Sequence, residues 1–176
     1  KNEIDLCREY GPLTDDLHTD FHECLGHGSG QLLEGTPSNA LKEYTSCLEE
    51  ARADLFALYY LADPKLVELG LVPSPEAYKA QYMSYIRNGI FTQFCRVELG
   101  KQNTEAHMQD RKLIAQWCYE HGLKDNVIEK KTLDGKTYFV INDFEALGGL
   151  FESTRVRWRA FAPARSSSCR RGWSGA

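Results

Sequence analysis

The chain has 176 residues, of which 42% are apolar and 26% are charged, and its formal net charge is −4. This composition is typical of a globular protein with one domain or a large part of one, and it excludes disordered and collagen-like chains. No run of about 18 uncharged apolar residues occurs, and the first residues lack the basic start and apolar core of a signal peptide, so we expect no membrane partner.

Six cysteines are spread along the chain without a Cys-x-x-Cys pair. The pattern predicts neither a disulfide framework nor a thiolate zinc site, and it favours a reducing, cytoplasmic setting. Because the first residue is not methionine, we expect the chain to be a piece of a longer protein.

Charge is unevenly distributed. All 25 acidic residues precede Arg155, whereas the segment 155–176 contains six arginines and no lysine. A basic end can indicate nucleic-acid binding, but this stretch shows no helical or strand periodicity. We therefore expect residues 154–176 to be an atypical tail, either foreign to the protein or disordered, with a phosphate-binding arm as the least favoured interpretation. The acidic body predicts no nucleic-acid partner.

Apolar spacing and start signals predict a mainly α-helical fold with one small β-hairpin. Asn39 and Thr104 are expected N-caps, and Pro75 is expected in a first helical turn. Strand-like runs on both sides of Leu-Asp-Gly predict the hairpin. Helices are expected at about 15–28, 39–62, 75–98 and 104–122, with a final helix that starts near Asn142 and Asp143.

The first of these expected helices carries His22, Glu23 and His27. In the HExxH pattern of zinc proteases the histidines are four residues apart, lie about 40° from each other around the helix and share one ion. Here they are five apart, which would separate them by about 140° on a regular helix. A one-residue π-type widening would restore the shared face, and Gly26 is the residue best able to relax the backbone. The alternative is a chance motif whose histidines bind no metal.

The helix expected at 39–62 has two different faces. The apolar face, which should point to the core, consists of Leu41, Tyr44, Leu48, Leu55 and Tyr59. The opposite face consists of Glu43, Cys47, Glu50 and Asp54. An acidic face is usually solvated, but beside the histidines Glu50 is well placed to be the third protein ligand of a His₂Glu site that leaves one position for water. Arg52 falls on the apolar face, so we expect it to pair with a carboxylate.

The segments HECLGHGSG and EEARAD resemble the HExxGH and EExRAD-like motifs of the dipeptidyl peptidase III family of zinc metallopeptidases, and the similarity runs from about residue 18 to about residue 151. The resemblance implies that residues 1–153 are part of the helical, zinc-bearing upper lobe of a two-lobed enzyme, and that the rest of the parent chain supplies the second lobe. It implies one Zn²⁺ per chain, bound by His22, His27 and Glu50. It further implies that Glu23 is the catalytic base and that Glu49 and Asp54 orient the ligands.

The segment EAHMQDR also resembles this family, in which its histidine and arginine face the substrate. The resemblance thus implies a catalytic role for His107 and a substrate-binding role for Arg111. Four residues apart on one helix face, His107 could donate to an oxyanion and Arg111 could hold a peptide carboxylate or carbonyl. The alternative is an exposed surface pair.

The reaction that the resemblance implies is the release of dipeptides from the amino end of oligopeptides by zinc-activated water, without a covalent intermediate. Cys24 is expected to pack rather than act as a nucleophile. Residues that hold the substrate's amino end in relatives belong largely to other parts of the parent chain, so activity of this chain alone stays open. The alternative from another class is a non-catalytic helical domain that binds a structural metal or a partner.

Overall fold

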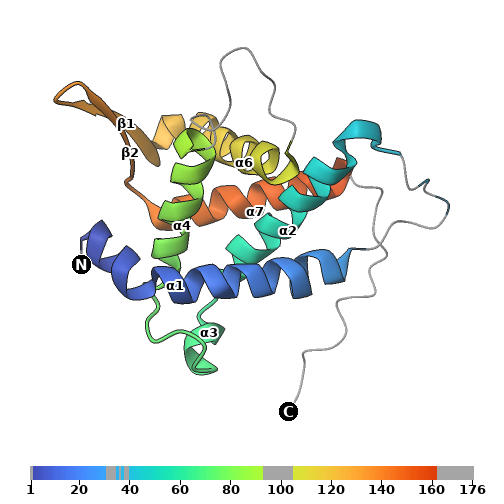
Figure 1. Ribbon diagram of the computed structural model, residues 1–176, viewed down its shortest axis with the longest axis horizontal. Coiled ribbons are helices and arrows are strands. Elements are labelled where there is room, and N and C mark those ends of the chain that lie inside the picture. Colours follow the sequence, from blue (N-terminus) through green and yellow to red (C-terminus); the bar gives the residue numbers. More distant parts are fainter. Residues whose placement is uncertain (1, 31–34, 36, 38–39, 93–104, 162–176) are drawn as a thin grey trace.

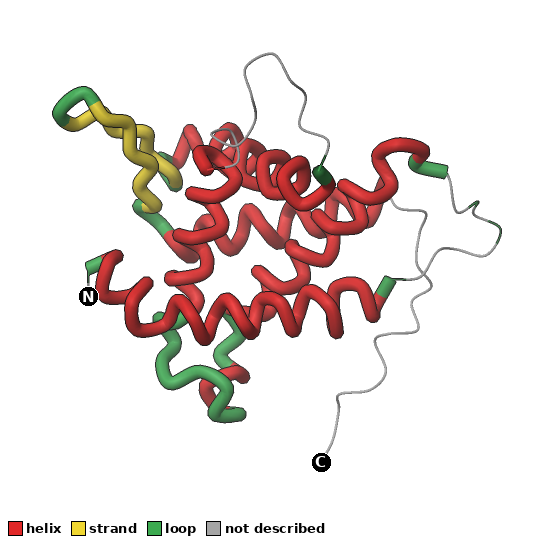
Figure 2. The backbone as a smooth tube through the Cα atoms, viewed as in Figure 1, coloured by secondary structure: helices red, strands yellow, loops and turns green. Residues whose placement is uncertain are grey.

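The computed structural model describes residues 2–30, 35, 37, 40–92 and 105–161. It is mainly α-helical with one antiparallel hairpin, which confirms the expected fold class (Figures 1 and 2). The helices and strands are α1 (Glu3–Phe21), α2 (Thr45–Leu61), α3 (Lys65–Glu68), α4 (Tyr78–Arg87), α6 (Ala106–Gly122), β1 (Ile128–Leu133), β2 (Lys136–Ile141) and α7 (Phe144–Phe161). Short π and 3₁₀ segments are η1 (His22–Gly26), η2 (His27–Ser29), η3 (Lys42–Tyr44), η4 (Asn88–Thr92) and η5 (Leu123–Asp125). None of the described helices has the length and apolar character that crossing a bilayer requires.

Helix α2 lies at the centre of the helical arrangement and contacts α1, α4, α6 and α7 (Figure 1). Its side chains are buried almost continuously from Ala51 to Leu58. The expectation of a single core-facing stripe is therefore wrong: Tyr44 is 63% exposed, whereas Asp54 on the opposite stripe is buried. The helix is covered on several sides because four other helices pack against it.

Helix α1 begins at Glu3, not near residue 15 as expected. The side chain of Asn2 caps it, because Oδ1 accepts a hydrogen bond of 2.9 Å from the N–H of Asp5. Pro12 lies inside the helix, where proline normally breaks or kinks it. The helix continues because its buried face extends to both sides of the proline, through Leu6, Tyr10, Thr14 and Leu17.

Two further helices begin later than expected. Helix α2 starts at Thr45, after a turn in which Lys42 has a φ of 51°. Helix α4 starts at Tyr78, three residues after Pro75, and passes at Asn88 into the π segment η4. The expected cap Asn39 and the end of the expected helix at 93–98 lie outside the described residues.

The last two helices begin with acidic caps. The Glu105 carboxylate accepts from the N–H groups of His107 and Met108, at 3.1 and 2.8 Å, and so caps α6. The expected cap Thr104 lies outside the described residues. The carboxylate of Asp143 accepts from the N–H of Ala146 at 2.8 Å, which confirms the expected start of α7.

Helix α7 crosses the boundary expected between residues 153 and 154. Residues 155–161, where the sequence shows no helical periodicity, belong to α7. The guanidinium of Arg155 lies 4.6 Å from the ring centre of Tyr59, so the beginning of the arginine-rich segment packs against α2. Residues 162–176 lie outside the described part of the chain.

Strands β1 and β2 pair from Ile128–Ile141 to Leu133–Lys136, which confirms the hairpin. Asp134 and Gly135 connect them with φ values of 50° and 73°. Two consecutive positive φ values define a type I′ turn, for which Asp-Gly is a favoured sequence. The hairpin projects away from the helices (Figure 2).

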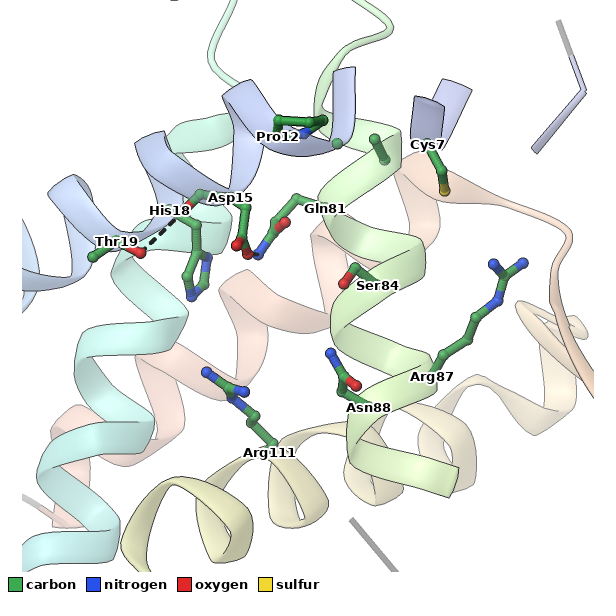
Figure 3. A pocket seen from close by; sticks show the side chains of 12 residues that line it. Cys7, Pro12, Asp15, His18, Thr19, Gln81, Ser84, Arg87, Asn88 and Arg111 are labelled. Carbon is green, nitrogen blue, oxygen red and sulfur yellow. Dashed lines mark hydrogen bonds between the residues drawn. The ribbon is translucent and has the colours of Figure 1, made fainter. Parts of the chain in front are cut away.

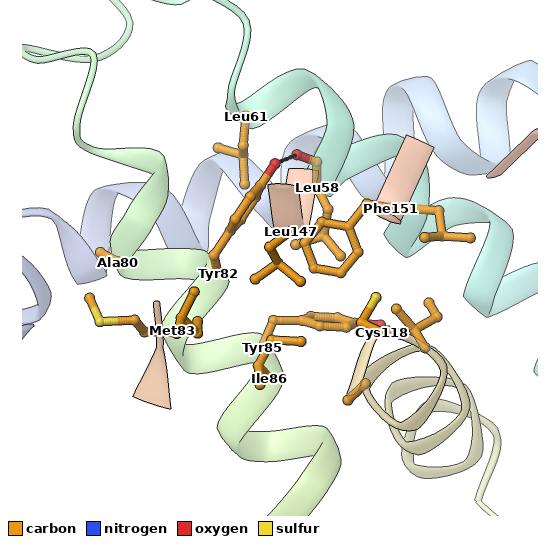
Figure 4. Close-up of a cluster of buried hydrophobic side chains, with 14 of the residues drawn as sticks. Leu58, Leu61, Ala80, Tyr82, Met83, Tyr85, Ile86, Cys118, Leu147 and Phe151 are labelled. Carbon is orange, nitrogen blue, oxygen red and sulfur yellow. Dashed lines mark hydrogen bonds between the residues drawn. The ribbon is translucent and has the colours of Figure 1, made fainter. Parts of the chain in front are cut away.

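An aromatic cluster fixes α4 and α7 against α2 (Figure 4). The ring of Tyr82 lies edge to face with that of Phe151, with 4.9 Å between centroids. The Tyr82 hydroxyl donates to the carbonyl of Leu58 at 3.1 Å, and burial raises the pKa of this hydroxyl. This packing holds in place the central helix, which carries most of the acidic residues described next.

Candidate metal centre

The end of α1 widens at His22 into the π segment η1. The N–H of His27 bonds to the carbonyl of His22, which is the five-residue hydrogen bond of a π-turn. The widening predicted from the histidine spacing is thereby confirmed. It brings the two rings edge to face, with centroids 4.7 Å apart.

Gly26 is required by a close contact between η1 and α2. A Cβ atom at this position would lie 2.7 Å from both Cα and Cβ of Ala53. Its φ of −65° and ψ of −88° also lie outside the regular helical region, so the expected backbone adjustment and close packing both occur at this glycine. The contact places the histidine-bearing turn within reach of the carboxylates of α2.

His22, His27 and Glu50 converge on one point. The Nε2 atoms of His22 and His27 lie 3.1 and 3.3 Å from the same atom, Oε2 of Glu50. Two ligands that are each about 2.0–2.1 Å from a tetrahedral zinc ion are about 3.3 Å apart, so the donor set and its spacing fit such an ion. Within the described residues the group contains no fourth ligand. These side chains are close enough to hold a metal ion.

A carboxylate holds the outer nitrogen of each histidine. Nδ1 of His22 lies 2.6 Å from Oδ1 of Asp54, and Nδ1 of His27 lies 3.1 Å from Oε1 of Glu49. When Nδ1–H donates to the carboxylate, Nε2 keeps its lone pair for an ion. Arg52 in turn donates from Nε to Oε2 of Glu49 at 2.9 Å, which confirms that this arginine pairs with a carboxylate.

Burial and charge act in opposite directions on the titratable groups. Burial lowers the pKa of His22, but the hydrogen bond to Asp54 and the charges of Asp54, Glu50 and Glu23 outweigh it and raise this pKa above its ordinary value. Burial raises the pKa of Asp54, yet its hydrogen bonds to His18 and His22 lower it strongly. The region is therefore rich in negative charge, which favours a cation.

Two residues that hold Asp54 were missed by the sequence reasoning. Nε2 of His18 lies 3.1 Å from Oδ1 of Asp54, and the hydroxyl of Tyr85 donates to Oδ2 at 2.9 Å. His18 precedes His22 by four residues, so both lie on one face of the helix, and this spacing was a signal in the sequence. Tyr85 lies on α4, and only the tertiary fold brings it to this carboxylate.

Glu23 and Cys24 follow His22 on the exposed side of η1. Glu23 is not a member of the ligand group, although its negative charge acts on His22. The expectation that Cys24 packs in the interior is wrong, because its side chain is exposed. The π-turn directs His22 inward and leaves its two successors at the surface.

Helix α6 brings His107 and Arg111 to the acidic residues of α2. Nδ1 of His107 lies 3.4 Å from Oε2 of Glu50, and the side chain is 49% exposed. Nε of Arg111 lies 3.9 Å from Oδ2 of Asp54. The two residues therefore meet the carboxylates of α2 and are not an isolated surface pair.

A cavity of about 720 Å³ is lined by residues of α1, α4 and α6 (Figure 3). His18 from α1, Gln81 from α4 and Arg111 from α6 are among the residues that line it. Figure 3 shows His18 and Arg111 pointing toward each other from different helices. Because both also contact Asp54, this carboxylate links the cavity to His22.

No protein-family model matches the chain, and no curated protein matches it by sequence. A functional assignment therefore depends on the geometry of the site and on the resemblance of its motifs.

Proposed function

We propose that the chain carries the zinc centre of a metallopeptidase that releases dipeptides from the amino end of oligopeptides, as the resemblance to the dipeptidyl peptidase III family implies. The observation that carries this proposal is the group of His22, His27 and Glu50, whose ligand atoms are spaced like those of tetrahedral zinc and which has no fourth member among the described residues. Four protein ligands close a structural zinc site, whereas a catalytic site keeps one position open.

Glu23 is the general base in this proposal. When bound, zinc supplies a Lewis acid that lowers the pKa of water and polarises a carbonyl. The Glu23 carboxylate takes a proton from the attacking water and returns it to the leaving amine. Its exposed place on η1 and its electrostatic effect on His22 support this role.

His107 and Arg111 serve the substrate in this proposal. His107 is half-exposed beside Glu50, so its ring can donate to the oxyanion that develops at the scissile carbonyl. The Arg111 side chain is partly exposed and lines the cavity, so its guanidinium can donate to a peptide carboxylate or carbonyl. We also place the protein in the cytoplasm, on the cysteine pattern of the sequence.

The variant Glu23→Gln separates metal binding from catalysis. We expect it to retain one zinc per chain by elemental analysis. Hydrolysis of a dipeptidyl arylamide should fall by about 10²–10⁴-fold, which is the usual contribution of a positioned acid–base group. The assay uses the protein that contains this chain together with the second lobe implied by the resemblance. Glu43→Gln, at an exposed carboxylate outside the ligand group, is the matched control and should change neither quantity.

Two outcomes would contradict the proposal in different ways. Full hydrolysis by Glu23→Gln would show that another group is the base. A folded native chain that takes up no zinc would favour the non-catalytic helical domain.

A further inference from the structure

A second group of ligand-type side chains lies beside the first. Ligand atoms of Glu50, His107 and Asp110 all lie within 4.8 Å of one another. His107 and Asp110 are three residues apart on α6, so they lie on the same face of this helix. The group shares Glu50 with the first group but uses neither of its histidines.

Asp110 is the unusual member of this second group. It is 0% exposed, and neither of its carboxylate oxygens has a hydrogen-bond partner within the described residues. An isolated charge in the interior costs several kcal/mol, so a buried carboxylate is normally paired with a donor, a proton or a cation. The part of the chain that is described provides no ion pair for it either, which leaves a proton or a bound cation.

The surroundings of Asp110 are rich in negative charge. The charges of Asp54 and Glu50 both act on its carboxylate, and Arg111 opposes them, but Nε of Arg111 faces Asp54 at 3.9 Å. The carboxylates of Asp54, Glu50 and Asp110 therefore lie near a single guanidinium, that of Arg111. The carboxylate nearest to His107 is that of Glu50, which already belongs to the first group.

We propose that Glu50, His107 and Asp110 form a second divalent-metal site, weaker than the first and bridged to it by the Glu50 carboxylate. The inference rests on the proposed metal centre, because Glu50 belongs to both groups. One imidazole and two carboxylates suit zinc and similar first-row ions, and ions in two-metal sites lie about 3.5–4 Å apart. The second site is the weaker one because one of its ligands is shared and another, His107, is half-exposed. When an ion occupies this site, the His107 ring nitrogen that binds the ion cannot also donate to the substrate.

Zinc titration of the chelator-treated chain against a chromophoric chelator tests this proposal. We expect the native chain to bind two equivalents, one tight and one weak. Asp110→Asn should weaken the second step at least about tenfold and leave the tight step unchanged, since losing even a supporting group costs about 10–100-fold in affinity. His107→Ala, at a half-exposed position that tolerates truncation, should do the same.

His27→Ala is the matched control, because His27 belongs to the first group alone. It should remove the tight step and keep the weak one. A native chain that binds a single equivalent, or Asp110→Asn and His107→Ala titrations that superimpose on the native one, would overturn the second site. If instead His27→Ala leaves the tight step intact, the proposed metal centre itself fails. Circular dichroism of every variant verifies that the fold is retained.

Discussion

The two sides of Glu50 differ in how their ligand-type side chains are held. On the α1 side, both ring nitrogens of His22 and of His27 contact carboxylates. On the α6 side, Asp110 is buried without a hydrogen-bond partner in the described residues, and His107 is half-exposed. The ligand-type side chains on the α1 side are therefore held in positions that suit an ion. On the α6 side, the buried Asp110 carboxylate still requires a proton or a cation.

Gly26→Ala should have the largest effect, because it breaks the preorganised side. The new Cβ would overlap Ala53, so η1 must move away from α2 and its histidines from Glu50. We expect zinc affinity to fall by more than about 100-fold and the free energy of unfolding to fall by about 1–3 kcal/mol. Zinc competition titration and urea unfolding measure the two effects.

Gly28→Ala is the control for this substitution. Its Cβ would meet only the carbonyl oxygen of Glu23, at the ordinary distance of 3.5 Å, so near-native affinity is expected. Native zinc affinity in Gly26→Ala would show that the close approach of η1 to α2 is not needed for binding.

Asp54→Asn comes second, because it removes the buried carboxylate that orients His22. We expect zinc affinity to fall by about 10–100-fold, as for other partners of metal-bound histidines. Tyr85→Phe is the control, since it removes one hydrogen bond to Asp54 but keeps the charge. Equal zinc affinities of Asp54→Asn and the native chain in a chelator competition would mean that the ring of His22 is fixed by packing alone.

Glu49→Gln should have a smaller effect on zinc affinity, near the lower end of the same range, about tenfold. The Glu49 side chain is 42% exposed and that of its partner His27 is 30% exposed, so solvent weakens their interaction. The same competition titration measures it. A larger loss in Glu49→Gln than in Asp54→Asn would contradict the view that burial sets the strength of the orienting contact.

Asp110→Asn should change how the stability of the metal-free chain depends on pH. The pKa of Asp110 rises from 3.8 to about 9 on folding, so between these values the folded chain holds a proton that the unfolded chain has released. The free energy of unfolding therefore falls as pH rises through this window. Asp110→Asn lacks this pH-dependent contribution to the free energy of unfolding. Relative to the native chain, the stability of the variant should therefore increase from pH 5 to pH 9. Urea unfolding in a metal chelator measures the difference, and a difference that is constant with pH would contradict the assignment.

The centre of the site was accessible from the sequence because its chemistry is local. Two histidines five residues apart can share an ion only on a widened helix, so the π-turn followed from the spacing. Glu50 and Asp54 could be located by their positions around one helix, whereas the orienting roles of Glu49 and Asp54 were implied only by the resemblance. Gly26 was singled out from the sequence, but its close contact with Ala53 could not be predicted, because Ala53 belongs to another helix.

The remaining features depend on tertiary packing and had no local pattern. Pro12 looks like a boundary in the sequence, yet packing on both sides of it keeps α1 continuous. An acidic stripe is indistinguishable from a solvated face until α1 and α6 cover it, so the burial of Asp54 could not be predicted. Asp110 was not singled out from the sequence, and Tyr85 reaches Asp54 only through the crossing of α4.

Zinc content after dialysis against a weak chelator tests the metal centre most directly. The native chain is compared with His22→Ala and Glu50→Ala, and circular dichroism verifies their folds. We predict about one zinc per native chain and none in either variant, because each substitution removes one of three convergent ligands. A folded native chain without zinc, or variants that retain the native content, would contradict the assignment of His22, His27 and Glu50 as a metal centre.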